Sequence, residues 1–158
     1  MREGLVSLAA LGVLLASVAA AQENAVRNPG FEEKSAGGQV AGWPERKPVY
    51  RFVDGAGRNG SCGLAFDNRD PKFYSFPSQK LDLQPGRCYA FEVWVRTEGL
   101  TGDESGATIC MEWSAADGKY LGGAYAEGVR GTSDGWVKVR GVTRVLPTNA
   151  VRVSVSPY

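Results

Sequence analysis

Histidine is absent from the 158-residue sequence, and its absence excludes several classes of enzyme. Without histidine the chain cannot build a Ser-His-Asp triad, a Cys-His dyad or a metal site with imidazole ligands. An excess of one charge is missing as well, because 18 basic and 17 acidic residues leave a net charge of +1. These charges are scattered along the chain, whereas a nucleic-acid-binding domain concentrates basic residues. We therefore expect neither His-dependent catalysis nor a nucleic acid partner.

Long hydrophobic runs are also scarce, and the one present lies at the N-terminus. Arg2 and Glu3 precede an apolar run over residues 5–18, and Ala19-Ala20-Ala21 follows it as an A-x-A cleavage pattern. This order is typical of a secretory signal peptide over residues 1–21. An uncleaved anchor is the alternative, but a transmembrane helix needs about 20 apolar residues. We expect a secreted protein, extracellular or periplasmic, with one mature domain over residues 22–158 and no membrane partner.

Cysteine is limited to Cys62, Cys88 and Cys110, an odd number. Export permits a disulfide, and an odd count leaves one thiol over. Cys62 and Cys88 are the preferred pair, because both stand at the beginnings of predicted strands that flank one hairpin. The alternative is that all three are small buried hydrophobic residues.

Glycine, with 21 residues, is plentiful, and turn signals recur every 8 to 12 residues. Between them lie short segments rich in β-branched and aromatic residues, which predict an antiparallel β-sandwich or barrel. The fold class we expect is all-β. The predicted strands cover residues 26–33, 49–54, 62–67, 73–83 (interrupted by Pro77), 88–97, 108–114, 120–125, 136–145 and 151–155.

Alternation in the segment 88–97 separates two faces. Tyr89, Phe91, Val93 and Val95 form an apolar face that predicts the core, whereas Trp94 alternates onto the other face. That second face also carries Glu92 and Arg96. The same rule in the next predicted strand places Glu112 away from the core. An antiparallel hairpin through the loop near Gly102 would then bring Glu112 close to Trp94.

An exposed tryptophan between charged residues is a suitable platform for a sugar. The indole can stack on the apolar face of a pyranose, and a few well-placed polar groups can bind its hydroxyls. A single exposed aromatic residue is also normal on protein surfaces, so a Trp94 without function is the alternative. The candidate carbohydrate-binding residues are Trp94, Glu92, Arg96, Glu112, Tyr74, Phe76, Tyr120 and Tyr125.

The order of several short motifs resembles a known family. "RNPGFEE", "GW", "NGSCGLAF", "QKLDLQPGRCYAFEVWVRTE" and "DGW" follow one another as in carbohydrate-binding modules of the family 4/9 type. The resemblance implies a galactose-binding-like jelly roll of two antiparallel sheets. It also implies non-catalytic binding of a polysaccharide or other glycan, as one module beside a catalytic domain that this chain lacks. On this match Tyr74 or Phe76 takes the position of a stacking aromatic residue.

The resemblance further implies a structural calcium ion. Its ligands would be Glu32, a backbone oxygen near Gly30, and Asp54. Calcium takes six to eight oxygen ligands, so these three residues are too few, and Glu32 as a solvated acid is the alternative. Members of the family usually end with one more strand that bears an "FDD" motif. This chain stops at Tyr158 without it, so we expect the last strand of the domain to be missing.

Three functions compete on this evidence. The first is a glycan-binding module without catalysis, which we favour. The second is a glycoside hydrolase that uses Glu92 and Glu112 as acid and base, but the sequence offers no nucleophile, base and orienting group together. The third is a structural or adhesive domain of a larger exported or cell-surface protein, because a fold does not determine a function.

Overall fold

The computed structural model describes residues 24–70, 72–102 and 104–158, and the predicted signal peptide lies outside them. The described residues form eight strands in three antiparallel sheets, ordered β1-β2, β3-β8-β5-β6 and β4-β7. This arrangement confirms the all-β fold. No helix among these residues reaches the length and hydropathy that crossing a membrane requires. The elements are β1 (Tyr50–Val53), η1 (Arg58–Gly60), β2 (Gly63–Phe66), β3 (Gln79–Leu81), β4 (Ala90–Val95), β5 (Ile109–Ser114), β6 (Tyr120–Tyr125), β7 (Val137–Val142) and β8 (Arg152–Pro157).

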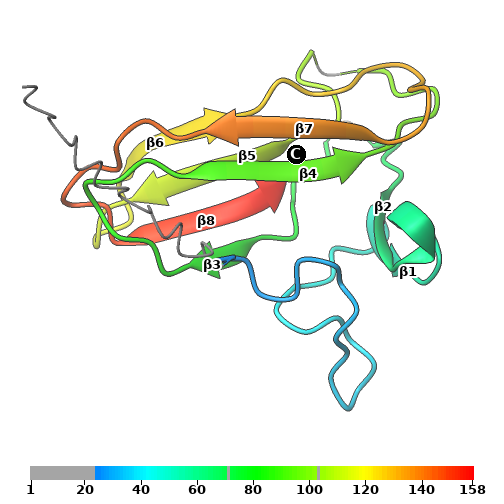
Figure 1. The fold of residues 1–158 in the computed structure, drawn as a ribbon, viewed down its shortest axis with the longest axis horizontal. Helices are drawn as coiled ribbons and strands as arrows, with labels where there is room; N and C mark the ends of the chain where they lie inside the picture. Colours follow the sequence, from blue (N-terminus) through cyan, green and yellow to red (C-terminus); the bar gives the residue numbers. More distant parts are fainter. Residues whose placement is uncertain (1–23, 71, 103) are drawn as a thin grey trace, which may run out of the picture.

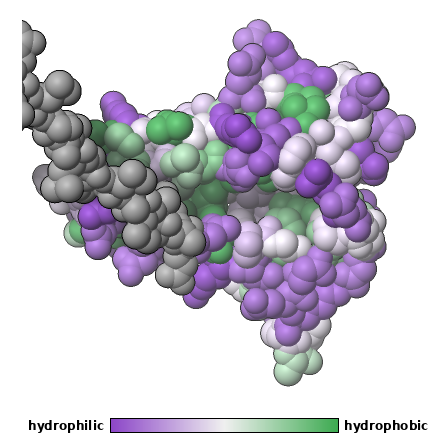
Figure 2. All heavy atoms as spheres, viewed as in Figure 1, coloured by the Kyte–Doolittle hydropathy of each residue, from purple (hydrophilic) through white to green (hydrophobic). Residues whose placement is uncertain are grey.

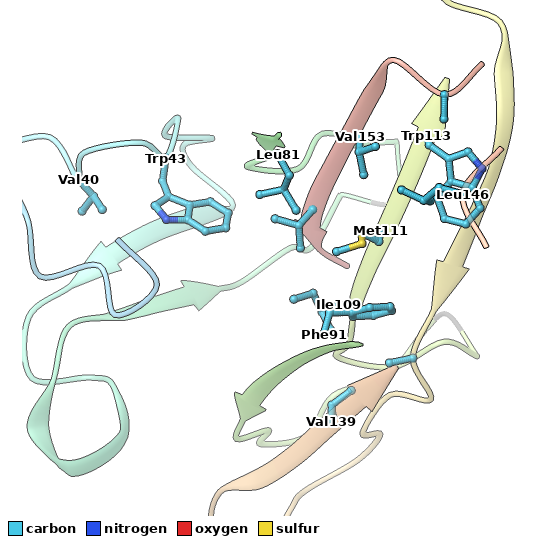
Figure 3. Packing of buried hydrophobic residues seen from close by; sticks show 13 residues of the cluster. Val40, Trp43, Leu81, Phe91, Ile109, Met111, Trp113, Val139, Leu146 and Val153 are labelled. Atoms are coloured by element: carbon cyan, nitrogen blue, oxygen red, sulfur yellow. The ribbon is translucent and has the colours of Figure 1, made fainter. Parts of the chain in front are cut away.

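The core lies between the four-stranded sheet and the β4-β7 sheet. Phe91 and Val139 belong to one layer, and Ile109, Met111 and Trp113 belong to the other. Figure 3 shows Phe91, Ile109 and Met111 converging between the two sheets. The long strands β4 to β8 make up the body of the molecule, and the β1-β2 hairpin lies at one end (Figure 1). Seen from the same side, hydrophilic residues cover most of the described surface, and hydrophobic residues appear in small groups (Figure 2).

The partner of β4 differs from the one we expected. β4 pairs with β7, whereas β5 pairs with β6 and β8 in the other sheet. The predicted hairpin between residues 88–97 and 108–114 is therefore wrong. The connection between them pairs with a distant loop instead, through bridges from Leu100 to Gly131 and from Ala107 to Val129. The chain thus crosses from one layer to the other at this point.

The segment 26–33, predicted as an edge strand, is not a strand. Asn28 and Phe31 both have positive φ angles, of 49° and 62°, which lie outside the β region. The Asn28 side-chain amide donates to the carbonyls of Glu33 and Ala41, both at 3.0 Å. Its Oδ1 accepts from the backbone N–H of Glu33 at 3.1 Å. The asparagine side chain thus replaces a strand partner and folds the segment into a loop.

The strand β8 lies in the middle of the four-stranded sheet, between β3 and β5. It pairs with Gln79–Leu81 on one side and with Ile109–Ser114 on the other. The predicted strand 73–83 is reduced to β3, because Pro77 has no N–H to donate to a ladder. The further strand that the family resemblance implies stays a prediction.

The three cysteines are free thiols, so the predicted disulfide between Cys62 and Cys88 is not formed. The prediction assumed that both residues flank one hairpin. In the structure, β2 pairs with β1 and β4 pairs with β7, and no hairpin joins the two cysteines. Cys62 and Cys110 are buried and Cys88 is exposed. Two of the three cysteines, Cys62 and Cys110, therefore fit the alternative of small buried hydrophobic residues.

We expect a thiol reagent to label about one cysteine in the native protein and three after denaturation. Cys88 is exposed, whereas burial raises the pKa of Cys110 to about 11 and also raises that of Cys62. The thiolate is the reactive form, so both buried residues should react slowly. Titration with a chromogenic disulfide in buffer and in guanidinium chloride measures this. Fewer than three thiols in denaturant would reveal a disulfide.

Candidate functional site

The outer face of the four-stranded sheet carries a polar and aromatic surface. Alternation along β5 turns Met111 and Trp113 into the core, so Glu112 lies on the outer face. The register places Gly123 of β6 beside Glu112 on one side and Ser154 of β8 on the other. Lys80 of β3 in turn faces Ser154. One row across the sheet therefore reads Lys80, Ser154, Glu112 and Gly123.

A β-bulge brings two tyrosines onto this face. Tyr120 and Tyr125 are five residues apart, so a regular strand would turn them to opposite faces. The register shifts between Trp113 and Ser114, and Tyr120 then lies opposite Ser114. Both rings consequently stand on the outer face, where Tyr120 is 58% and Tyr125 is 52% exposed. A bulge of this kind commonly redirects a side chain next to a functional site.

Tyr125 and Glu112 form a short hydrogen bond. The Tyr125 hydroxyl donates to Glu112 Oε1 at 2.5 Å and lies 3.4 Å from the Tyr120 hydroxyl. The bond to Glu112, followed by the contact with Tyr120, raises the pKa of Tyr125 above its usual range. The Tyr125 hydroxyl therefore stays protonated and leaves the second Glu112 oxygen as an acceptor. The cluster offers one carboxylate and two aromatic rings to a ligand.

Gly123 supports the two tyrosine rings. A Cβ atom at this position would lie 2.9 Å from both the Tyr120 hydroxyl and Tyr125 Cε2. Real Cβ atoms do not approach neighbours this closely, so any side chain here would displace the rings. Glycine lets both rings lie over the backbone of β6, directly beside Glu112.

Two hollows flank the tyrosine pair. One, of about 410 Å³, is lined by Lys80, Glu112, Trp113, Ser114, Gly118, Tyr120, Arg152, Val153 and Ser154. The other, of about 310 Å³, is lined by Glu104, Ser105, Thr108, Tyr125, Ala126, Glu127, Gly128, Arg130 and Tyr158. Glu112 and Tyr120 border the first hollow, and Tyr125 borders the second. Both hollows are open and offer polar side chains of both charges.

Further aromatic rings continue from Tyr125. The Tyr158 ring lies 6.0 Å from that of Tyr125, and Phe76 stacks on Tyr158 at 5.0 Å. Tyr74 meets Phe76 edge-on at 4.9 Å and is 75% exposed. Phe76 also contacts the buried Tyr50. The structure therefore brings Tyr74, Phe76, Tyr120, Tyr125 and Glu112 onto one side of the molecule.

Trp94 does not belong to this surface, which corrects the predicted juxtaposition with Glu112. Trp94 and Glu92 point outward from β4, in the layer opposite β5, because Phe91 of the same strand fills the core. The two outer faces are separated by the whole sandwich. Arg96 follows β4 and its guanidinium lies 5.4 Å from the Trp136 ring centroid. The eight predicted binding residues thus divide between two sides of the molecule.

The same division bears on the alternative of a glycoside hydrolase that uses Glu92 and Glu112. Glu92 lies on the outside of one sheet and Glu112 on the outside of the other. A glycosidase needs its two carboxyl groups on either side of one bond, at most about 9.5 Å apart. Glu92 and Glu112 therefore cannot act on one glycosidic bond.

The residues predicted as calcium ligands lie near one another but are already engaged. Lys34 Nζ lies 2.6 Å from both carboxylate oxygens of Asp54, and this ammonium holds the pKa of Asp54 below its usual value. Glu32 Oε1 accepts the backbone N–H of Cys62 at 2.7 Å. Gly30 lies in the adjacent exposed loop. No group of three or more His, Cys, Asp or Glu side chains in the described part of the chain is placed to hold a metal. The donor set therefore does not fit calcium, because a lysine already provides the positive charge.

We expect calcium and a chelator to leave the melting temperature unchanged. Asp54 is neutralised by Lys34, and a Ca²⁺ ion would have to displace that ammonium and gather further oxygens. Differential scanning calorimetry in about 5 mM CaCl₂, and separately in excess EDTA, measures the effect. This calcium concentration exceeds the Kd of about 0.1–1 mM that is typical of extracellular calcium sites. A melting temperature that rises with calcium would restore the predicted ion.

Sequence reasoning missed several residues of the surface. Tyr158 follows the last predicted strand, where alternation assigns it no face, yet it joins Phe76 to Tyr125. Lys80 and Arg152 were missed because the pairing of β3 with β8 is not visible in the sequence. Alternation along residues 151–155 does place Arg152 and Ser154 on one face, and this signal was available.

Comparisons with known proteins give a fold and no family. A scan against models of protein families found no match, and no curated protein matches the sequence. Among solved structures, the chain is similar to the N-terminal CBM22-1 and GH10 modules of endo-1,4-β-D-xylanase 10B from Clostridium thermocellum, complexed with xylohexaose. The TM-score is 0.53 at 17% identity, over 73% of this chain and 23% of that one. The family 4/9 type is therefore not supported, and what the likeness does show is the β-sandwich fold of a carbohydrate-binding module.

Proposed function

We propose that the chain binds a polysaccharide or oligosaccharide without catalysis, through the outer face of the four-stranded sheet. The observation that carries this proposal is the pair of exposed tyrosines fixed beside the Glu112 carboxylate. Aromatic rings can stack on the apolar face of a sugar, and the carboxylate can accept its hydroxyls. The fold likeness to a carbohydrate-binding module is consistent with this role.

The arrangement favours an extended ligand. Tyr125, Tyr158, Phe76 and Tyr74 follow one another with centroid separations of 6.0, 5.0 and 4.9 Å. The two hollows, one beside Tyr120 and the other beside Tyr125, would accommodate sugars beyond the central one. We therefore propose an oligosaccharide of several residues as the ligand, rather than a single sugar.

We also propose that the protein is secreted and acts beside a catalytic domain. The predicted signal peptide at residues 1–21 supports export. The chain spans only 23% of the xylanase chain that it resembles, and that chain also contains a GH10 module. A glycan-binding module commonly serves by holding an attached enzyme on its polymer, which gains effective concentration.

We expect Tyr125→Ala to weaken binding of a neutral oligosaccharide by about 30-fold, the effect of losing a hot-spot tyrosine of about 2 kcal/mol. The variant removes both the ring and the support of Glu112. Isothermal titration with xylohexaose, cellohexaose and mannohexaose measures the dissociation constants. Tyr125→Phe should retain part of the affinity because it keeps the ring.

Val142→Ala is the control, since Val142 is exposed on the opposite sheet. It should bind as the wild type does. Wild-type protein that melts cooperatively but binds none of the oligosaccharides would favour the structural or adhesive domain instead. Equal binding by Tyr125→Ala and wild type would place the site elsewhere.

A further inference from the structure

Two cations lie over the indole ring of Trp94. The Arg58 guanidinium carbon is 4.0 Å from the ring centroid, and Lys138 Nζ is 4.9 Å from it. Lys138 is the direct neighbour of Trp94 in the β4-β7 ladder. Arg58 comes from the turn between β1 and β2, far away in the sequence. Trp94 therefore positions positive charge as well as offering an apolar surface, and it is 37% exposed.

The turn that presents Arg58 is closed by hydrogen bonds. Gly57 N–H donates to the Ser61 carbonyl at 2.8 Å, and the Ser61 hydroxyl donates to the Arg58 carbonyl at 2.9 Å. Asn59 and Gly60 take positive φ angles of 58° and 78°, which suit this Asn-Gly pair in a tight turn. The backbone at Arg58 is thereby fixed, and less conformational entropy is lost when its side chain binds a ligand.

Positive charge on this face exceeds negative charge. Glu92 bonds Lys138 at 2.7 Å and Arg140 at 3.2 Å, and Lys138 foremost holds the pKa of Glu92 below its usual value. The cluster around Trp94 thus contains one carboxylate and three cations. Arg58 has no carboxylate partner among the described residues. A guanidinium stacked on an indole keeps its in-plane N–H groups free for a planar acceptor.

We propose that Arg58, Trp94, Lys138 and Arg140 form a second binding site, which takes the carboxylate of a uronic acid residue in an acidic polysaccharide. Arg58 would bind the carboxylate with two N–H groups, because its fork matches carboxylate geometry. The exposed part of the indole would contact the apolar face of the same sugar. Lys138 and Arg140, whose one carboxylate partner among the described residues is Glu92, add attraction for the negative charge.

A sugar fits these observations better than a protein or nucleic acid. The cluster is small, and the chain as a whole carries a net charge of only +1, so it lacks the broad basic surface that a nucleic acid requires. A protein interface would be expected to add an apolar centre around the charges. Here the Trp94 ring lies under Arg58 and Lys138, an arrangement whose size suits one sugar ring with one carboxylate.

The second site is independent of the tyrosine surface, by which we mean the outer face around Tyr120, Tyr125 and Glu112. It lies on the β4-β7 sheet, on the other side of the core from Glu112 and Tyr125. A failure of neutral oligosaccharides to bind would therefore contradict the proposed function and leave this inference standing. Likewise, a failure of the uronates to bind would contradict this inference and leave the proposed function standing.

The test is isothermal titration of the protein with tetragalacturonate and with tetramannuronate, at low and at high salt. We expect wild type to bind at least one of them, with affinity that falls as salt rises, because exposed charges are screened. Arg58→Gln should weaken this binding about tenfold or more, which corresponds to the loss of one charge-assisted contact. The affinity of Arg58→Lys should lie between those of wild type and Arg58→Gln, since lysine keeps the positive charge but lacks the two parallel N–H groups of arginine.

Arg69→Gln is the matched control, because Arg69 is exposed and its ion pair is with Asp67 alone among the described residues. It should bind as the wild type does. The fully methyl-esterified tetragalacturonate should bind at least tenfold more weakly than the acid. The proposal is overturned if neither uronate binds, if Arg58→Gln changes nothing while its melting temperature is that of wild type, or if tetraglutamate binds as tightly as the uronates.

Discussion

Gln79→Leu is expected to lower the free energy of unfolding by about 3 kcal/mol or more. Gln79 is only 1% exposed, and its side chain makes three hydrogen bonds to backbone. Oε1 accepts from Arg27 N–H at 2.7 Å, and Nε2 donates to the carbonyls of Arg27 and Gly42 at 3.0 and 3.1 Å. Leucine keeps the volume but removes all three of these part-buried hydrogen bonds, at about 0.5–1.5 kcal/mol for each.

The reason for such an effect is the position of Gln79. It connects β3 to the loop that carries Val40 and Trp43, two members of the core. Without the side-chain amide, this loop would be held by apolar contacts and by Asn28. Urea denaturation followed by tryptophan fluorescence measures the loss. Gln84→Leu is the control, because Gln84 is exposed, and it should stay within about 0.5 kcal/mol of wild type. A similarly small change for Gln79→Leu would contradict the account.

Trp113→Ala is expected to cost about 3–5 kcal/mol of stability, the range for emptying a large aromatic site in a core. Trp113 is 1% exposed and packs in the cluster that joins both sheets. Figure 3 shows it beside Leu146, on the side of β5 that faces the core. Its Nε1 has no hydrogen-bond partner among the described residues. Trp113→Phe therefore loses volume without losing a hydrogen bond, and it should cost clearly less.

Chemical denaturation of both variants, with Trp136→Ala for comparison, checks this expectation. Trp136 is half-buried, so its loss should cost less than that of Trp113. Burial predicts a larger cost for Trp113→Ala than for Trp136→Ala, and the smaller loss of volume predicts a smaller cost for Trp113→Phe than for Trp113→Ala. If Trp113→Ala were as stable as Trp136→Ala, the core would be able to collapse around the missing ring.

Local sequence patterns predicted the strands and their faces well. The inward positions Phe91, Met111 and Trp113 are buried, and Glu92 and Trp94 point outward. These features depend on alternation, which is a property of a single strand. The Asn59-Gly60 turn between β1 and β2 likewise agrees with the backbone preferences of this dipeptide.

Pairing between strands could not be predicted in the same way. Consecutive strands are spatial neighbours in about two-thirds of cases, and β4 and β5 are an exception. The wrongly predicted pairing of residues 88–97 with residues 108–114 placed Trp94 beside Glu112, whereas the two residues lie on opposite sides of the molecule. The predicted strand 26–33 failed for another reason, because the Asn28 side chain forms bonds that no local pattern reveals.

The candidate surface was predicted in part for the same reason. Tyr120 and Tyr125 share a face only because of the bulge at Trp113 and Ser114, and the sequence contains no reliable signal for it. Tyr74 and Phe76 are connected to Tyr125 because Phe76 stacks on Tyr158 and Tyr74 contacts Phe76. Aromatic residues were correctly chosen as candidates by type, whereas their grouping depends on contacts between distant segments.

The central place of β8 also has a consequence for the order in which the chain folds. β8 supplies the hydrogen-bonding partner of both β3 and β5, so the four-stranded sheet cannot close before residues 152–157 have been synthesised. The contact between β3 and β8 closes a loop of some seventy residues, as the pairing of Gln79 with Val155 shows. Such non-local contacts raise the contact order, and β-sandwiches of high contact order fold in milliseconds to seconds. Nascent chains that end before Arg152 should therefore remain open to proteases, and the Tyr158 ring can join Tyr125 only after β8 has been added.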